Sequence, residues 1–170
     1  MDILIFLILA IMPALTIVAG LKDITTMTIP NWISVALVIA FFPAAAAVGL
    51  PPMTILLHVG IAFAALIVAM GLFALRVFGG GDGKLIAATC LWMGLSGTGP
   101  FVLWTAVIGG LFCLIVILAR QHVRPFVFGA PAWVDVLMEP KGDIPYGTAI
   151  AAGALMAYPA SPLVMAFLAR

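Results

Sequence analysis

The sequence predicts an all-α, polytopic membrane protein with six transmembrane helices. Hydrophobic residues make up 66% of its 170 positions and charged residues only 8%, whereas about 25% of the residues in ordinary globular chains are charged. So few charges cannot cover the surface of a soluble fold of this size. The net charge of +1 also excludes a nucleic-acid-binding protein, because no run of Lys and Arg could follow a phosphate backbone.

The charged residues leave four charge-free stretches of 19, 52, 35 and 26 residues. A transmembrane helix needs about 20 apolar residues, so these stretches accommodate one, two, two and one helices. The predicted spans are about 3–21, 32–50, 53–75, 83–96, 100–119 and 146–168. They use nearly the whole chain, and we therefore expect residues 1–170 to form a single membrane-embedded domain.

Proline and glycine mark the ends of the first three spans. The first span leads into a polar turn that ends in Ile29-Pro30-Asn31, and the second stops at Pro51-Pro52. The third ends at Arg76 and the glycine-rich run at 79–84.

The fourth span is the shortest. Gly97, Gly99 and Pro100 separate it from the fifth, and its thirteen or fourteen apolar residues could instead form a re-entrant hairpin. A hairpin would move four of the seven basic residues to the outer face, which the distribution of basic residues in membrane proteins disfavours. We therefore expect a short helix that begins inside the membrane boundary.

The basic residues also predict the orientation of the spans. The connections after the first, third and fifth spans hold six of the seven basic residues, and the other two connections hold none. The six are Lys22, Arg76, Lys84, Arg120, Arg124 and Lys141. Because basic loops remain in the cytoplasm, we expect these connections to be cytoplasmic and the N-terminus to be outside.

The polar stretch 120–145 allows two interpretations. Pro131 could open a short helix through Glu139, with Trp133 on its apolar side and Asp135 on another face, lying on the inner leaflet. An irregular loop with a buried Trp133 fits the same residues.

Two acidic residues are candidates for chemistry, because ionisable groups at the membrane are costly. Asp23 lies just past the first span and Asp82 lies in the glycine run, and the predicted topology puts both at the cytoplasmic edge. Two carboxylates in a partly dehydrated site cannot both ionise cheaply, so one would hold a proton while the other is charged. The charged one can take a proton from water and the other can donate to a carbonyl oxygen. Such a pair can hydrolyse a peptide bond.

Structural roles explain the same residues as well. Asp23 could pair with Lys22 or cap the polar turn, Asp82 could cap the fourth span, and Lys84 could be an interfacial anchor. Composition and spacing alone leave both interpretations open.

No other catalytic arrangement stands out in the sequence. It has no His-Glu-x-x-His segment, and His58 and His122 have no partner cluster, so we expect no metal and no other cofactor. Cys90 and Cys113 lie 23 residues apart inside apolar stretches and are interpreted as small core residues.

Three motifs occur in one order along the chain. Asp23 is followed by Ile29-Pro30-Asn31, then comes Gly79-Gly80-Gly81-Asp82-Gly83-Lys84-Leu85, and finally Ile144-Pro145-Tyr146-Gly147. In this order, and inside a six-span chain, they resemble the type IV prepilin peptidases, the G-x-G-D class of membrane aspartic proteases. The resemblance covers roughly 20–170.

The resemblance implies an aspartic endopeptidase that removes the N-terminal leader from prepilins or pseudopilins at the cytoplasmic face of the bacterial inner membrane. Asp23 and Asp82 would be the catalytic pair, without a metal or nucleotide, and Gly79 and Gly81 would shape the substrate's approach. Lys84, or Lys22, could pair with an acidic residue that follows the cleavage site. The expected partners are thus a prepilin and membrane lipid, and no nucleic acid.

Two features resemble the short branch of this family that serves Flp (tight-adherence) pili, namely the small size and the Ile144-Pro145-Tyr146 segment. The larger, bifunctional members carry a cysteine-bearing insertion near the N-terminus and also methylate the new pilin N-terminus. Here the connection between the first two spans is short and has no cysteine, so N-methyltransferase activity is not expected.

A small transporter or proton-conducting subunit is the alternative function. Its ionisable residues should lie near the bilayer midplane, often within an inverted repeat. Here they lie at one edge of the predicted spans and no repeat is visible.

Overall fold

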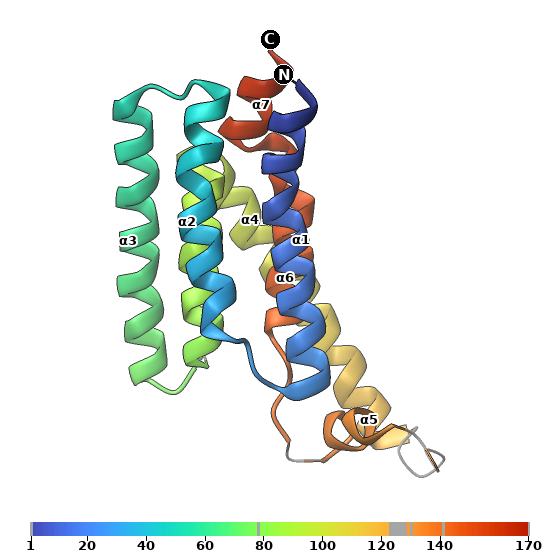
Figure 1. The fold of residues 1–170 in the computed structure, drawn as a ribbon. Coiled ribbons are helices and arrows are strands. Elements are labelled where there is room, and N and C mark those ends of the chain that lie inside the picture. Colours follow the sequence, from blue (N-terminus) through green and yellow to red (C-terminus); the bar gives the residue numbers. More distant parts are fainter. Residues whose placement is uncertain (1, 78, 123–128, 130, 141, 170) are drawn as a thin grey trace.

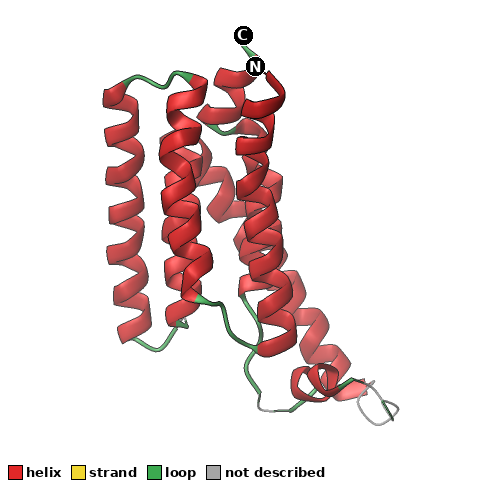
Figure 2. Ribbon diagram, viewed as in Figure 1, coloured by secondary structure: helices red, strands yellow, loops and turns green. Residues whose placement is uncertain are grey.

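The computed structural model describes residues 2–77, 79–122, 129, 131–140 and 142–169. Within these ranges the chain forms helices joined by short loops, with no strand (Figure 2). The helices, labelled in Figure 1, are α1 (Asp2–Thr26), α2 (Asn31–Val48), α3 (Pro52–Ala74), α4 (Gly80–His122), α5 (Ala132–Leu137), α6 (Gly147–Ala157), the 3-10 turn η2 (Tyr158–Ala160) and α7 (Pro162–Leu168).

Five helical stretches of the described chain are long and apolar enough to cross a membrane. They are α1, α2, α3, α4 and the stretch Gly147–Leu168. The prediction of an all-α, polytopic membrane protein is therefore confirmed. Of the 23 residues of α3, only His58 and Ala69 are buried, as expected for a helix that turns most of its apolar surface toward lipid.

Helix α4 consists of two arms that run in opposite directions. Gly94 interrupts it with φ 59° and ψ −166°, a backbone conformation essentially restricted to glycine. Asp82 and Asp143 line one cleft, and Arg120 donates to the Asp143 carbonyl at 2.9 Å. Both ends of α4 therefore lie at the same end of the bundle, although a straight helix would separate Asp82 from Arg120 by about 57 Å. Figure 1 shows the reversal.

The two arms correspond to the predicted spans 83–96 and 100–119, but the break between them lies elsewhere than expected. It falls at Gly94 and not at Gly97, Gly99 or Pro100, and the helix continues through all three. At about 1.5 Å per residue the first arm, 80–93, is about 21 Å long, shorter than a hydrocarbon core of about 30 Å. With the two arms of α4 counted separately, the described helices run along the bundle six times. The number of membrane crossings stays a prediction, because the short first arm need not cross the whole bilayer.

The last predicted span, 146–168, is not one continuous helix. It is divided into α6, η2 and α7. Pro159 lies in η2, and Pro162 opens α7 behind Ser161, whose side chain accepts a hydrogen bond from Val164 N at 3.4 Å. Proline cannot donate a backbone hydrogen bond and clashes with the preceding turn, so two prolines this close end one helix and start another.

The region 120–145 contains the short helix and is not an irregular loop throughout. Pro131 precedes α5, which ends at Leu137 and not at the predicted Glu139. Trp133 is about one-third exposed and Leu137 is buried. The placement of α5 on the inner leaflet stays a prediction.

The core lies between α1, α2, the first arm of α4, and α6. Met12, Phe41, Trp92 and Ile150 are fully buried there. The Trp92 indole also donates to the Leu37 carbonyl at 2.9 Å, which ties α4 to α2.

The basic residues of the connections predicted to be cytoplasmic lie at one end of the bundle, as far as the structure describes them. Arg76 lines the same cleft as Asp23, next to Lys22 in the chain, and Arg120 and Lys84 belong to the two ends of α4. Arg124, Lys141 and Arg170 lie outside the described residues. The clustering agrees with the orientation argued from the sequence, and the side of the membrane stays a prediction.

Candidate functional site

A cleft of about 930 Å³ opens at the end of the bundle where α1 ends and α4 begins. Helix α1, the end of α3, the start of α4 and the segment that leads into α6 all contribute to it. The lining residues are Asp23, Met27, Phe73, Ala74, Arg76, Val77, Gly79, Asp82, Asp143, Ile144, Pro145 and Tyr146. The structure therefore brings Asp23 and Asp82 together, although they lie 59 positions apart in the sequence.

Asp23 is held by the start of α6. Helix α1 continues to Thr26, past the predicted end of the first span, so Asp23 lies in its last turns with only 6% of its surface exposed. Its Oδ2 accepts a hydrogen bond from Gly147 N at 2.6 Å, and the backbone N–H of Thr148 also donates to the carboxylate. The expected structural roles of Asp23 were pairing with Lys22 or capping the polar turn, and the structure instead shows its carboxylate bonded to the start of α6.

Asp82 occupies the first turn of α4 and accepts a hydrogen bond from the backbone N–H of Gly79. A carboxylate in this position stabilises a helix N-terminus, as the structural interpretation of the sequence proposed. Asp82 also lies close enough to Asp23 for the charge of one carboxylate to act on the other. Capping and pairing therefore occur together.

The glycines of the 79–84 run have separate roles. A Cβ on Gly79 would lie 3.0 Å from Asp82 Oδ2, so this glycine makes room for the carboxylate. A Cβ on Gly81 would lie 3.2 Å from Ile29 Cβ. Gly81 therefore lets α4 approach the Ile29-Pro30 segment, and its contacts are with the protein's own backbone and side chains.

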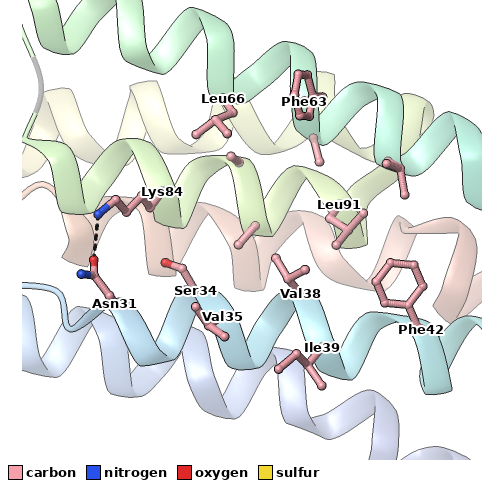
Figure 3. Close-up of a pocket in the computed structure, with 14 residues that line it drawn as sticks. Asn31, Ser34, Val35, Val38, Ile39, Phe42, Phe63, Leu66, Lys84 and Leu91 are labelled. Atoms are coloured by element: carbon pink, nitrogen blue, oxygen red, sulfur yellow. Dashed lines mark hydrogen bonds between the residues drawn. The ribbon is translucent and has the colours of Figure 1, made fainter.

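Lys84 lies away from the cleft. Being two positions after Asp82, it points about 200° around the helix from it. Its Nζ donates to Asn31 Oδ1 at 2.9 Å. Both residues lie at one end of an apolar pocket of about 560 Å³ between α2, α3 and α4 (Figure 3). Lys84 is thus near Asp82 in the chain but lines a different space.

Tyr146 is a lining residue to which the sequence gave no role of its own, although the Ile-Pro-Tyr-Gly motif singled out its segment. Its ring packs closely on Gly109, where an added Cβ would lie 2.6 Å from the hydroxyl oxygen. Burial raises the pKa of the Tyr146 hydroxyl, and the negative charges that Cys113 and Asp82 carry when ionised raise it further. The hydroxyl therefore stays protonated near neutral pH and can donate a hydrogen bond.

No histidine or cysteine is among the residues that line this cleft. The ring of His58 is buried and its Nδ1 donates to the Leu91 carbonyl at 2.7 Å, while His122 contacts the Leu118 carbonyl of its own helix. In the described part of the chain no three His, Cys, Asp or Glu side chains are grouped so that they could hold a metal ion. Two carboxyl groups that share one cleft can accept and donate protons.

Comparison with known families gives a match over much of the chain. The model of the type IV leader peptidase family matches residues 10–114, which include Asp23 and Asp82 and end before Tyr146 and Gly147. Searches of curated proteins and of solved structures returned no match.

Proposed function

The chain belongs to the type IV leader peptidase family, and we propose that it is an aspartic endopeptidase that removes the N-terminal leader from a prepilin or pseudopilin. Family membership makes the protein a peptidase, and its apolar helices make it a multi-pass membrane protein. The observation that carries the aspartic mechanism is the shared cleft of Asp23 and Asp82 at one end of the bundle.

The proposed reaction uses a water molecule and no covalent intermediate. One carboxylate takes a proton from the water, whose oxygen attacks the scissile carbonyl carbon, while the other carboxyl group protonates the carbonyl oxygen. The cleft suits this chemistry, because its walls partly exclude water from both groups and it opens at the end of the apolar helices. An extended leader could enter there while the hydrophobic helix of the prepilin stays in the bilayer.

The test is co-expression with a cognate prepilin. Asp23→Asn and Asp82→Asn should each slow leader removal at least about 100-fold, since general acid and base groups contribute about that much or more. Asp135→Asn is the matched control, because Asp135 is exposed on α5 and does not line the cleft. Membrane levels of each variant are compared by immunoblot. Normal processing in either dyad variant would contradict the two-aspartate mechanism.

We also propose Lys84, or Lys22, as the partner of an acidic residue just after the cleavage site. Lys84 ends an apolar pocket, and Lys22 is exposed beside Asp23. Lys84→Glu or Lys22→Glu, whichever removes the pairing lysine, should raise KM. A compensating acid-to-lysine change in the substrate should then restore cleavage by that variant and not by the other. If no combination restores cleavage, neither lysine pairs with that acid.

We further propose that the protein serves Flp-type pili in the bacterial inner membrane, with the cleft on the cytoplasmic side. Methylation is not part of this proposal, because the connection between α1 and α2 is only four residues long and has no cysteine. The intact mass of the processed pilin should therefore equal that of the unmethylated chain. A mass higher by one methyl group would show that the protein has the second activity.

A further inference from the structure

The contact between Asp23 and the start of α6 joins residues 124 positions apart. Gly147 N lies 2.6 Å from Asp23 Oδ2, a short N–H···O hydrogen bond, and hydrogen bonds to a charged acceptor are shorter and stronger than those to a neutral one. The Thr148 N–H donates to the same carboxylate. Two backbone donors of one helix N-terminus therefore converge on a single carboxylate.

This contact depends on close packing between α1 and α6. The Thr148 hydroxyl donates to the Gly20 carbonyl at 3.1 Å. A Cβ on Gly20 would lie 2.9 Å from Ala151 Cβ, and a Cβ on Gly147 would lie 2.8 Å from Asp23 Oδ2. Neither glycine could gain a side chain without moving the two helices apart or displacing the carboxylate.

We propose that the N-terminus of α6 holds Asp23 as the ionised general base and thereby makes Asp82 the protonated general acid, with Gly147 and Thr148 as positioning residues. This assignment rests on the proposed peptidase function. Backbone N–H donors and the positive end of a helix dipole both favour a carboxylate anion. Burial disfavours the anion at both positions, and both carboxylates lie at a helix N-terminus, so the difference between them rests on the hydrogen bonds. Asp82 accepts from one such donor, Gly79, so the single proton of the pair is held more favourably there.

The other charged and titratable groups around the pair leave this difference in place. Arg76 and Asp143 line the cleft beside both carboxylates and bring one charge of each sign, and Lys22 is exposed on the same helix as Asp23. Tyr146 also lines the cleft and stays neutral. The two N–H donors of α6 bind Asp23 alone.

The proton transfers balance over one cycle. Asp23 takes a proton from water as the new C–O bond forms, and Asp82 gives its proton to the carbonyl oxygen, which yields a gem-diol. Asp23 then protonates the amide nitrogen as the C–N bond breaks, and Asp82 recovers a proton from a diol hydroxyl. The pair returns to its starting state, with Asp23 ionised and Asp82 protonated.

The first test uses Gly147→Ala in the purified full-length enzyme with a prepilin substrate. The added Cβ should lower kcat about tenfold or more, leave KM unchanged, and move the acid limb of the kcat–pH profile upward by about one pH unit, because the base loses hydrogen bonds that favour its charged form. Gly110→Ala is the control, since an added Cβ meets nothing within 4 Å there. An unchanged pH profile with a reduced kcat would leave Gly147 a packing role only and would overturn the proposal.

The second test needs no substrate and is valid even if Gly147→Ala fails to fold. Infrared difference spectroscopy over a pH titration should show, in the wild type, a carboxyl band that belongs to the dyad group that loses its proton at the higher pH. This band should be absent in Asp82→Asn. In Asp23→Asn it should remain but titrate at lower pH, because the Asp23 charge that favours the protonated form of Asp82 is gone. The opposite pattern would overturn the assignment while leaving the peptidase function intact. Failure of the wild type to cleave any prepilin would instead contradict the proposed function, and the infrared result would still identify the protonated residue.

Discussion

At the scale of single residues, each carboxylate of the candidate site accepts a hydrogen bond that supports the fold, in addition to its proposed chemical role. Asp23 accepts hydrogen bonds at the start of α6 and Asp82 accepts one at the start of α4. The sequence left capping and pairing as competing interpretations. They are compatible because the N-termini of two helices meet in one cleft, where each carboxylate completes a helix end and faces the other.

The glycine run offers a matched pair of substitutions. Gly81→Ala should lower the free energy of unfolding by about 1 kcal/mol or more and reduce cleavage, because the new Cβ would lie 3.2 Å from Ile29 Cβ and push α4 away. Gly80→Ala is the control, since its nearest neighbour is the Phe73 ring at 3.5 Å, an ordinary contact. Thermal unfolding in detergent and the cleavage rate measure both effects. Equal behaviour of the two variants would contradict the close approach at Gly81.

At the scale of elements, the reversal of α4 decides where the first arm lies. The arm ends at Gly94, and the buried His58 imidazole donates to the carbonyl of Leu91, three residues before the break. The ring of His58 also stacks on Phe41, with centroids 5.4 Å apart. His58 lies near the start of α3, and both its hydrogen bond and its ring contact are made beside the reversal of α4.

Gly94→Ala should therefore destabilise the protein. The residue has a positive φ that costs an L-residue about 1–3 kcal/mol, and its Cβ would lie 2.5 Å from His58 Nε2. We expect a loss of at least about 2 kcal/mol in the free energy of unfolding, with lower activity because the first arm carries Asp82. Gly99→Ala, where an added Cβ meets nothing within 4 Å, should unfold like the wild type in the same denaturant titration. A wild-type midpoint for Gly94→Ala would show that α4 does not need this turn.

At the scale of the whole molecule, one side chain connects the end of α4 to the cleft. Arg120 donates to the carbonyls of Leu137, Gly142 and Asp143 at 2.8, 2.8 and 2.9 Å. These bonds hold α5 and the segment that leads through Tyr146 into α6. Because Gly147 follows at once, the same segment also sets the position of the donors to Asp23.

Arg120→Met should therefore loosen the cleft without touching either carboxylate. Each bond from a charged donor contributes about 1.5–3 kcal/mol when its geometry is good, although partial exposure lowers the sum. We expect cleavage to fall several-fold and limited proteolysis near α5 to accelerate. His122→Ala is the control, because the His122 ring contacts the Leu118 carbonyl of its own helix. An unchanged rate of proteolysis in Arg120→Met would show that the hydrogen bonds of Arg120 do not hold α5 and the segment that leads into α6.

The scarcity of charge in the sequence determined the fold class, the approximate ends of most helices, and the choice of the two acids proposed to be catalytic. These are local properties, because a charged residue or a proline acts on the helix that contains it. Only the tertiary structure decided the break at Gly94 instead of Gly97, the division of the last span, and the placement of Lys84 outside the cleft. It also decided that Gly147 meets Asp23, since that contact joins residues 124 positions apart and depends on how closely α1 and α6 pack.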